Sequence, residues 1–192
     1  MAHAQELEYF EPTGIATPKL GMWLFLSGET VLFGGVIMTI VMFRISFPGW
    51  NEASEHTNTI VGSVNTFVLL TSSMLVALAH KMTSLEKFGT AKLCILGCIL
   101  LGILFVALKW GVEWPGEISH GYTVQSGPFW QLYYGATGLH AVHVILGILA
   151  FTVILVLYMG NWRPKYSLEA TALYWHFVDI VWLFLWPLFY LS

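Results

Sequence analysis

The chain has 192 residues, of which 57% are hydrophobic and only 10% are charged, and its formal net charge is −3. Because soluble globular domains carry about 25% charged residues, this composition excludes an ordinary soluble domain and indicates a membrane protein. The small net charge also argues against nucleic acid as a partner.

The first nineteen residues form a polar tail that contains Glu6, Glu8 and Glu11. A cleavable signal peptide would need a short apolar stretch near the amino terminus, and the apolar run after this tail is too long for one. The sequence therefore predicts a polar tail at 1–19, followed by a single membrane domain at 20–192.

Five apolar segments follow the tail, and each is long enough to cross a membrane at about 20 residues per helical span. They lie at 20–43, 58–80, 92–110, 130–159 and 171–191. We predict an all-α fold, a polytopic bundle of five transmembrane helices.

The basic residues indicate how the bundle is oriented. With five crossings, the amino-terminal tail and the second and fourth loops share one side of the membrane. Six of the eight lysines and arginines lie on that side: Lys19, Lys81, Lys87, Lys92, Arg163 and Lys165. Only Arg44 and Lys109 lie on the other. The positive-inside rule then predicts a cytoplasmic amino terminus and an outside carboxyl terminus.

The longest predicted loop, 111–129, carries Trp114, Tyr122, Phe129 and Trp130 among several glycines and prolines. Aromatic side chains of membrane proteins gather at the level of the lipid headgroups. We expect this loop to form an ordered cap there.

Glu29 lies near the middle of the first apolar segment, about 14 Å from its start at the rise of an α-helix. Small and hydroxyl residues flank it: Ser27, Gly28, Thr30, Gly34 and Gly35. Small residues let a second helix approach closely, and hydroxyls could bond the carboxyl group. An acid at this depth is a functional candidate. Glu29 is either a proton-linked or lipid-facing carboxyl group, or a protonated acid that joins two helices by one hydrogen bond.

Other polar residues occupy the later segments: Asn65, His80, His140, His143, His176 and Asp179. Asp179 is the only aspartate and follows His176 by three residues, so the two share a helix face. Facing histidines in a helical bundle can ligate haem iron, and neutral histidines that bond between helices explain the pattern equally well. We expect these six residues to bond between helices or to lie at a subunit interface.

No nucleophile with a base, phosphate loop or metal-ligand spacing is found in the sequence. Cys94 and Cys98 lie four apart within one apolar segment, which predicts buried core residues and no disulfide framework. The sequence therefore predicts no catalytic, cofactor or metal site in this chain.

Three collinear motifs resemble a known family, subunit III of the haem–copper terminal oxidases. They are KLGMWLFLSGET at 19–30, TGLHAVHVILG at 137–147 and YWHFVDIVWLFL at 174–185. Asn65-Thr66, Ser72-Ser73 and His80 complete the series. Many members have seven spans, and this chain is similar to the last five of them.

The resemblance implies a subunit that packs directly on catalytic subunit I, with subunit II and a small subunit IV as further partners. Haem and copper would be held by the partner chains and not by this one, and phospholipids would lie in an interhelical cleft. The family's carbodiimide-reactive glutamate falls on Glu29. The subunit would support sustained turnover and proton uptake in a cytochrome c oxidase of the bacterial cytoplasmic membrane.

Other readings remain open at this point. Related subunits of quinol oxidase and nitric-oxide-reductase complexes are the nearest alternatives within the family. A self-contained membrane cytochrome with histidine ligands, or a small transporter with Glu29 as its coupling acid, would be a different class of protein.

Overall fold

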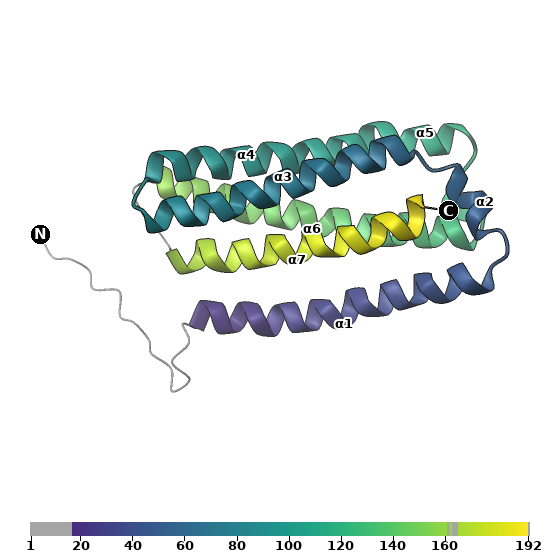
Figure 1. Cartoon of the computed structure of the whole chain (residues 1–192), viewed down its shortest axis with the longest axis horizontal. Helices are drawn as coiled ribbons and strands as arrows, with labels where there is room; N and C mark the ends of the chain where they lie inside the picture. Colours follow the sequence, from purple (N-terminus) through teal and green to yellow (C-terminus); the bar gives the residue numbers. More distant parts are fainter. Residues whose placement is uncertain (1–16, 161, 163–164, 192) are drawn as a thin grey trace, which may run out of the picture.

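The structure is a computed structural model, and it describes residues 17–160, 162 and 165–191. Five long helices make up most of it (Figure 1): α1 (Thr17–Ser46), α3 (Thr59–Ser84), α4 (Phe88–Leu108), α6 (Pro128–Met159) and α7 (Lys165–Tyr190). The short elements are α2 (Trp50–Glu55), the π-helical turn η1 (Lys109–Glu113), α5 (Trp114–Ser119) and the 3-10 turn η2 (Val124–Ser126).

Within the described residues, five helices are long and apolar enough to cross a membrane, which confirms the predicted number of spans. The third span differs from its prediction. The sequence predicted a loop after residue 110, but α4 continues through η1 into α5, and the candidate span runs from Phe88 to Ser119. Pro115 lies in the first turn of α5, directly after the π-helical turn η1.

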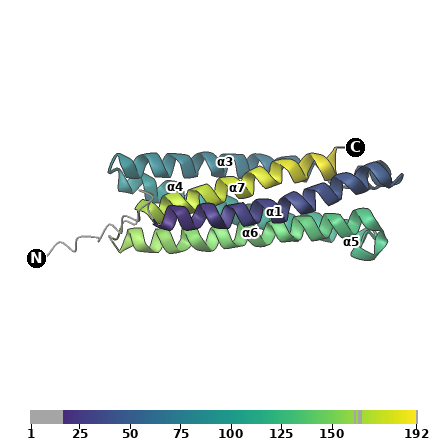
Figure 2. The same ribbon diagram turned by 90° about the horizontal axis from the view of Figure 1, so that it is seen from below.

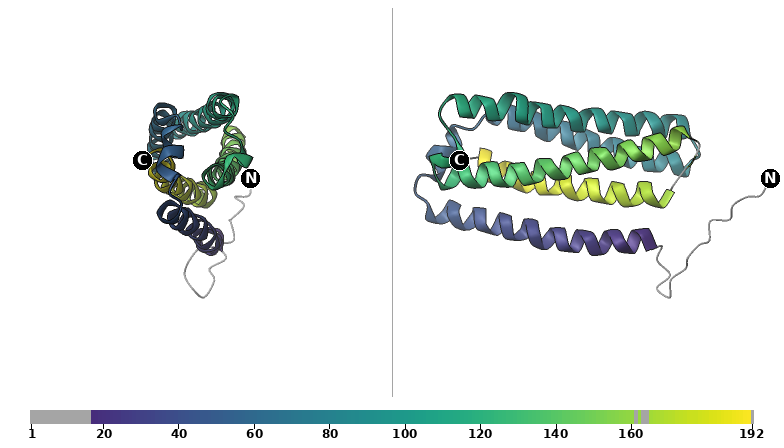
Figure 3. Two further views of the ribbon diagram at one scale, coloured as in Figure 1. Left: turned by 90° about the vertical axis from the view of Figure 1, so that its right-hand side faces the viewer. Right: turned by 180° about the vertical axis from the view of Figure 1, so that it is seen from behind.

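Four of the long helices, α3, α4, α6 and α7, surround a common core, and α1 lies outside this ring. The end-on view in Figure 3 shows α1 beside α7, and Figure 2 shows the same helix crossing the face formed by α6 and α7. The contacts agree, since α1 packs mainly on α7 and only slightly on α6. The buried cysteines Cys94 and Cys98 are free thiols in the core, as predicted.

The ring of four helices is held together by close contact between α6 and α7 at Trp175. This side chain is fully buried, and its indole nitrogen donates a hydrogen bond to Ser72 Oγ at 3.0 Å. Gly147 makes room for the ring, since a Cβ atom at this position would lie 2.5 Å from Trp175. A Cβ atom added at Gly102 on α4 would lie 3.0 Å from the same indole ring. Small residues at these two positions therefore set how closely the helices approach.

The outlying helix α1 is attached along one narrow stripe and at both ends. Its buried residues Leu26, Phe33 and Ile40 recur every seven positions, which is the spacing of a single helix–helix seam. Near its start, Lys19 Nζ lies 2.7 Å from Glu169 Oε1. Near its end, Arg44 donates hydrogen bonds to the backbone oxygens of Pro187 and Leu188 in the last turn of α7, and to that of Leu191 just after it at 2.8 Å. The last carbonyls of a helix have no partner within it, so Arg44 caps α7.

Two aromatic residues of the predicted interfacial loop are not at the surface. Phe129 and Trp130 are 1% and 3% exposed, and Phe129 packs against Trp50 and Phe189 with ring centroids 4.8 and 5.8 Å apart. They begin α6, whose first turn faces the core instead of the headgroup region. The short helix α2 covers them with Trp50.

Candidate functional site

The acid predicted from the first span contacts a histidine of the fourth. Glu29 on α1 lies with its Oε2 atom 3.1 Å from Nε2 of His143 on α6. Two further contacts hold this imidazole: its Nδ1 lies 2.8 Å from the Leu139 carbonyl, and Phe33 meets the ring edge-on at 4.9 Å. The backbone carbonyl of His143 accepts a hydrogen bond from the Tyr174 hydroxyl at 2.9 Å. Residues of α1, α6 and α7 therefore meet at this point.

The contact with Leu139 determines how the pair shares its protons. A carbonyl oxygen can only accept, so Nδ1 of His143 carries a hydrogen. In the neutral ring Nε2 is then an acceptor, and the carboxyl group of Glu29 must be the donor. Moving that proton to Nε2 produces a carboxylate beside an imidazolium. Both forms hold the same number of protons and no net charge, so the pair can hold and shift one proton.

A pair without net charge is less costly than a lone charge at this depth in the membrane. A lone charged carboxylate at the centre of a membrane costs on the order of 3 kcal/mol, and a partner within hydrogen-bond distance removes much of that cost. The pair is not sealed, because the side chains of Glu29 and His143 are 17% and 9% exposed. The pair is therefore partly accessible at the surface of the described chain.

The residues around Glu29 behave differently from the prediction. The hydroxyls of Ser27 and Thr30 bond the backbone oxygens of their own helix, at 2.7 and 2.8 Å, and neither bonds the carboxyl group. A Cβ atom added at Gly28, Gly34 or Gly35 would meet nothing within 4 Å. These small residues therefore mark no close helix approach within the described part of the chain.

The other predicted polar residues fall into two groups. His176 is bonded, with Nδ1 2.7 Å from Ser73 Oγ, and within the described chain it makes no hydrogen bond with Asp179 despite the shared helix face. His80 is half-buried near the end of α3. Asn65, His140 and Asp179 are buried inside the ring. The side-chain polar atoms of Asn65 and His140 have no hydrogen-bond partner in the described chain, and the Asp179 carboxyl group lies near the Ser73 hydroxyl.

His140 illustrates this second group. Its ring lies between Phe105 and Trp182, with centroid distances of 5.5 and 5.1 Å. His140 and His143 therefore point to different places although they are three residues apart. In the part of the chain that the structure describes, no group of three histidines, cysteines or acids is placed to hold a metal ion.

A buried charged cluster at the end of the bundle near the carboxyl terminus was not predicted. Lys109 and Glu113 form an ion pair at 2.8 Å, and neither side chain is exposed. The ammonium group also donates to the hydroxyls of Tyr133 and Tyr190, at 3.1 and 2.5 Å. Both tyrosines in turn donate to Glu113 Oε1. A lysine and a glutamate four apart, directly after an apolar run, were the only sequence signal for this cluster.

Known proteins that are similar to this chain are oxidase subunits. Residues 11–192 match the family model for cytochrome c oxidase subunit III. The chain is 34% identical over 183 residues to heme-copper oxidase subunit I+III of Aeropyrum pernix, which covers 90% of this chain and 22% of that longer protein.

Two separate subunits are similar over most of their own length. Cytochrome c oxidase subunit 3 of Bacillus subtilis is 32% identical, over 90% of this chain and 84% of that protein. The probable quinol oxidase subunit 3 of Staphylococcus haemolyticus is 31% identical, over 90% and 88%. With five membrane-spanning helices and a family match from residue 11 to the end, the chain belongs to the cytochrome c oxidase subunit III family of the haem–copper oxidases.

Proposed function

We propose that this chain is the non-catalytic subunit III of a proton-pumping respiratory oxidase in the bacterial cytoplasmic membrane. Oxygen would be reduced to water at haem and copper held by partner chains, and this chain would pack directly on subunit I. The name of the Aeropyrum pernix relative supports that neighbour, since it joins subunits I and III in one protein. Subunit II, a small subunit IV and phospholipids complete the proposed surroundings.

The Glu29–His143 pair carries the functional part of the proposal. The two groups are close enough to share one proton within a membrane helix bundle, and both side chains are partly accessible. A group of this kind can supply or buffer a proton beside a partner that takes up protons during turnover. The same contact also joins α1 to the ring of four helices. The test must therefore separate a role in proton transfer from a role in holding α1 in place.

Glu29→Gln makes this separation. The glutamine amide can still donate to Nε2 of His143, so α1 stays attached, but it cannot give up a proton. We expect the complex to assemble in normal amounts, to lose carbodiimide labelling of this chain, and to lose activity faster during sustained turnover. Oxygen consumption followed over many turnovers, with labelling measured by mass spectrometry, checks this.

Glu52→Gln is the matched control, because Glu52 is an exposed acid on α2 outside the candidate spans. It should leave both labelling and sustained turnover unchanged. Equal labelling in Glu29→Gln and the unaltered chain would show that Glu29 is not the reactive group. Unaltered sustained turnover in Glu29→Gln would show that the Glu29–His143 pair serves only to hold α1 against the other helices.

A quinol oxidase subunit is the second candidate, favoured by the name of the Staphylococcus haemolyticus relative. The electron donor binds to other chains of the complex, so the two candidates differ in partners and not in this fold. A self-contained cytochrome is less well supported, since two of its four candidate ligands, His143 and His176, are hydrogen-bonded within the bundle. A haem band that persisted in the isolated chain would favour it.

A further inference from the structure

Three of the predicted polar residues gather inside the ring of four helices, around Trp182 of α7. The indole nitrogen of Trp182 donates to Thr66 Oγ1 at 3.0 Å, and Asn65 is the neighbour of Thr66 on α3. The imidazole of His140 on α6 lies 5.1 Å from the indole, centroid to centroid. Asp179 precedes Trp182 by three residues on α7, so the two share a helix face. Asn65, His140 and Asp179 therefore lie at a similar depth in the bundle.

Asn65 and His140 are buried at this depth with their hydrogen-bonding groups unmet. Both residues are 0% exposed, and neither the amide of Asn65 nor the ring nitrogens of His140 have a hydrogen-bond partner among the described residues. Asp179 lies near the Ser73 hydroxyl, which is also 2.7 Å from His176 Nδ1. That hydroxyl has one hydrogen and cannot donate to both. An unmet buried polar group lowers the folding equilibrium by roughly ten-fold.

The missing partner must both donate and accept hydrogen bonds. The amide of Asn65 has two N–H donors and an oxygen acceptor, and the neutral imidazole of His140 has one nitrogen of each kind. A cation would meet only the acceptors, and an anion would meet only the donors. Water does both, and a buried water molecule typically makes about three hydrogen bonds to groups of this kind. The chemistry of the unmet groups therefore selects water.

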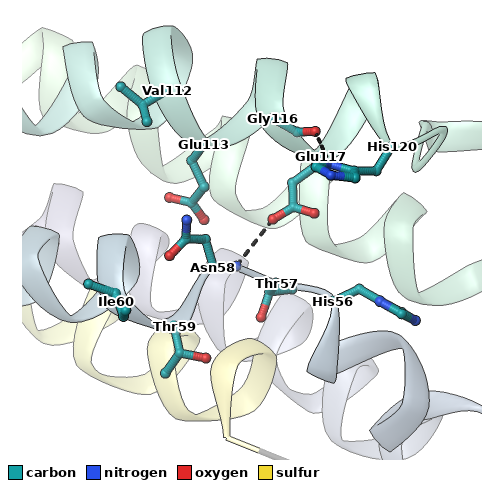
Figure 4. Close-up of a pocket in the computed structure, with 10 residues that line it drawn as sticks. All are labelled: His56, Thr57, Asn58, Thr59, Ile60, Val112, Glu113, Gly116, Glu117 and His120. Atoms are coloured by element: carbon teal, nitrogen blue, oxygen red, sulfur yellow. Dashed lines mark hydrogen bonds between the residues drawn. The ribbon is translucent and has the colours of Figure 1, made fainter.

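Polar groups connect this site with the end of the bundle. A pocket of about 420 Å³ lies there between the start of α3 and the η1–α5 segment, and Figure 4 shows the hydrogen bond between Asn58 and Glu117 beside it. The lining includes Glu113, which is fully buried and lies 2.8 Å from Lys109 Nζ. The same Nζ atom lies 5.4 Å from the centroid of the Trp182 ring. We expect water to enter along this route.

We propose that the ring of four helices holds a cluster of internal water molecules that bridges Asn65, His140 and Asp179. This cluster lies inside the ring, whereas the Glu29–His143 pair joins the ring to α1 outside it. The motif at 137–147 therefore serves two sites, with His143 on the face toward α1 and His140 on the face toward the core. The proposal rests on these buried groups and does not depend on the proposed role of Glu29.

Hydroxyl-radical labelling of the intact complex tests the proposal, because α7 offers a matched pair of tryptophans. Trp175 and Trp182 are 0% and 1% exposed, so neither meets bulk water. An X-ray pulse splits water into radicals that oxidise the side chains next to it, and a scavenger in the buffer removes the radicals formed in bulk. We expect Trp182 to be oxidised several-fold more than Trp175, as measured by mass spectrometry of the peptides.

The diagnostic variant is Asn65→Leu, because leucine has the same number and branching of side-chain heavy atoms and no polar atom. Oxidation of Trp182 should fall to about the level of Trp175. Asn51→Leu, at an exposed position on α2, is the control and should change neither tryptophan.

Two results would overturn the proposal. One is equal oxidation of Trp175 and Trp182 in the unaltered complex, a comparison that needs no variant to fold. The other is an excess at Trp182 that survives in Asn65→Leu with its fold intact.

Discussion

Lys109→Met is expected to lower the free energy of unfolding by about 3–5 kcal/mol, the usual cost of removing one partner from a buried ion pair. The lysine is 0% exposed and gives one hydrogen bond each to Glu113, Tyr133 and Tyr190. Without it, a buried carboxylate loses its counter-charge where α4, α6 and α7 meet. Unfolding of the purified chain in mixed micelles, followed by circular dichroism, measures this loss.

The double variant Lys109→Met/Glu113→Gln separates charge from packing. It removes both charges while nearly keeping the volume of the cluster, so most of the lost stability should return. Lys87→Met, at an exposed lysine in the turn between α3 and α4, should change little. If Lys109→Met were no less stable than Lys87→Met, the buried ion pair would not stabilise the chain as described.

Gly147→Ala is expected to destabilise the chain by about 1–3 kcal/mol through overpacking. Its new methyl group would lie 2.5 Å from the Trp175 ring, which is fully buried and cannot move aside without disturbing its bond to Ser72. The same unfolding measurement checks this value.

Gly135→Ala on the same helix is the matched control. A Cβ atom there meets nothing within 4 Å. Alanine should therefore stabilise the helix by up to about 1 kcal/mol through its helix propensity. Opposite signs for the two substitutions are the expected result, and equal effects would show that α6 and α7 do not approach at Gly147 as described.

Hydropathy was sufficient to predict an all-helical chain with five membrane spans. A membrane helix must satisfy its own backbone hydrogen bonds, so it is visible in the sequence as a long apolar run. Glu29 could be singled out for the same reason, as an acid inside such a run. Its partner could not, since His143 is 114 positions away and only the packing of α1 on α6 and α7 brings them together. From the sequence alone, three other histidines in the predicted spans were equally plausible partners of Glu29.

The misjudged details have local physical causes. Ser27 and Thr30 were expected to bond Glu29, but a hydroxyl on a helix readily bonds the carbonyl three or four residues earlier. From the sequence, Lys109 was counted only as a charged residue of a loop. The glycines and prolines after residue 110 suggested that the helix ends there. A π-helical turn instead carries the helix onward and turns Lys109 and Glu113 into the core.

The most direct test of the proposed role is purification of the tagged chain from its native membrane in mild detergent. A reduced-minus-oxidised visible spectrum is recorded beside a gel of the co-purifying chains. The proposal predicts haem bands together with larger hydrophobic subunits, and loss of the bands when those subunits are stripped away. Haem retained by the single chain would contradict it and would make this protein a membrane cytochrome.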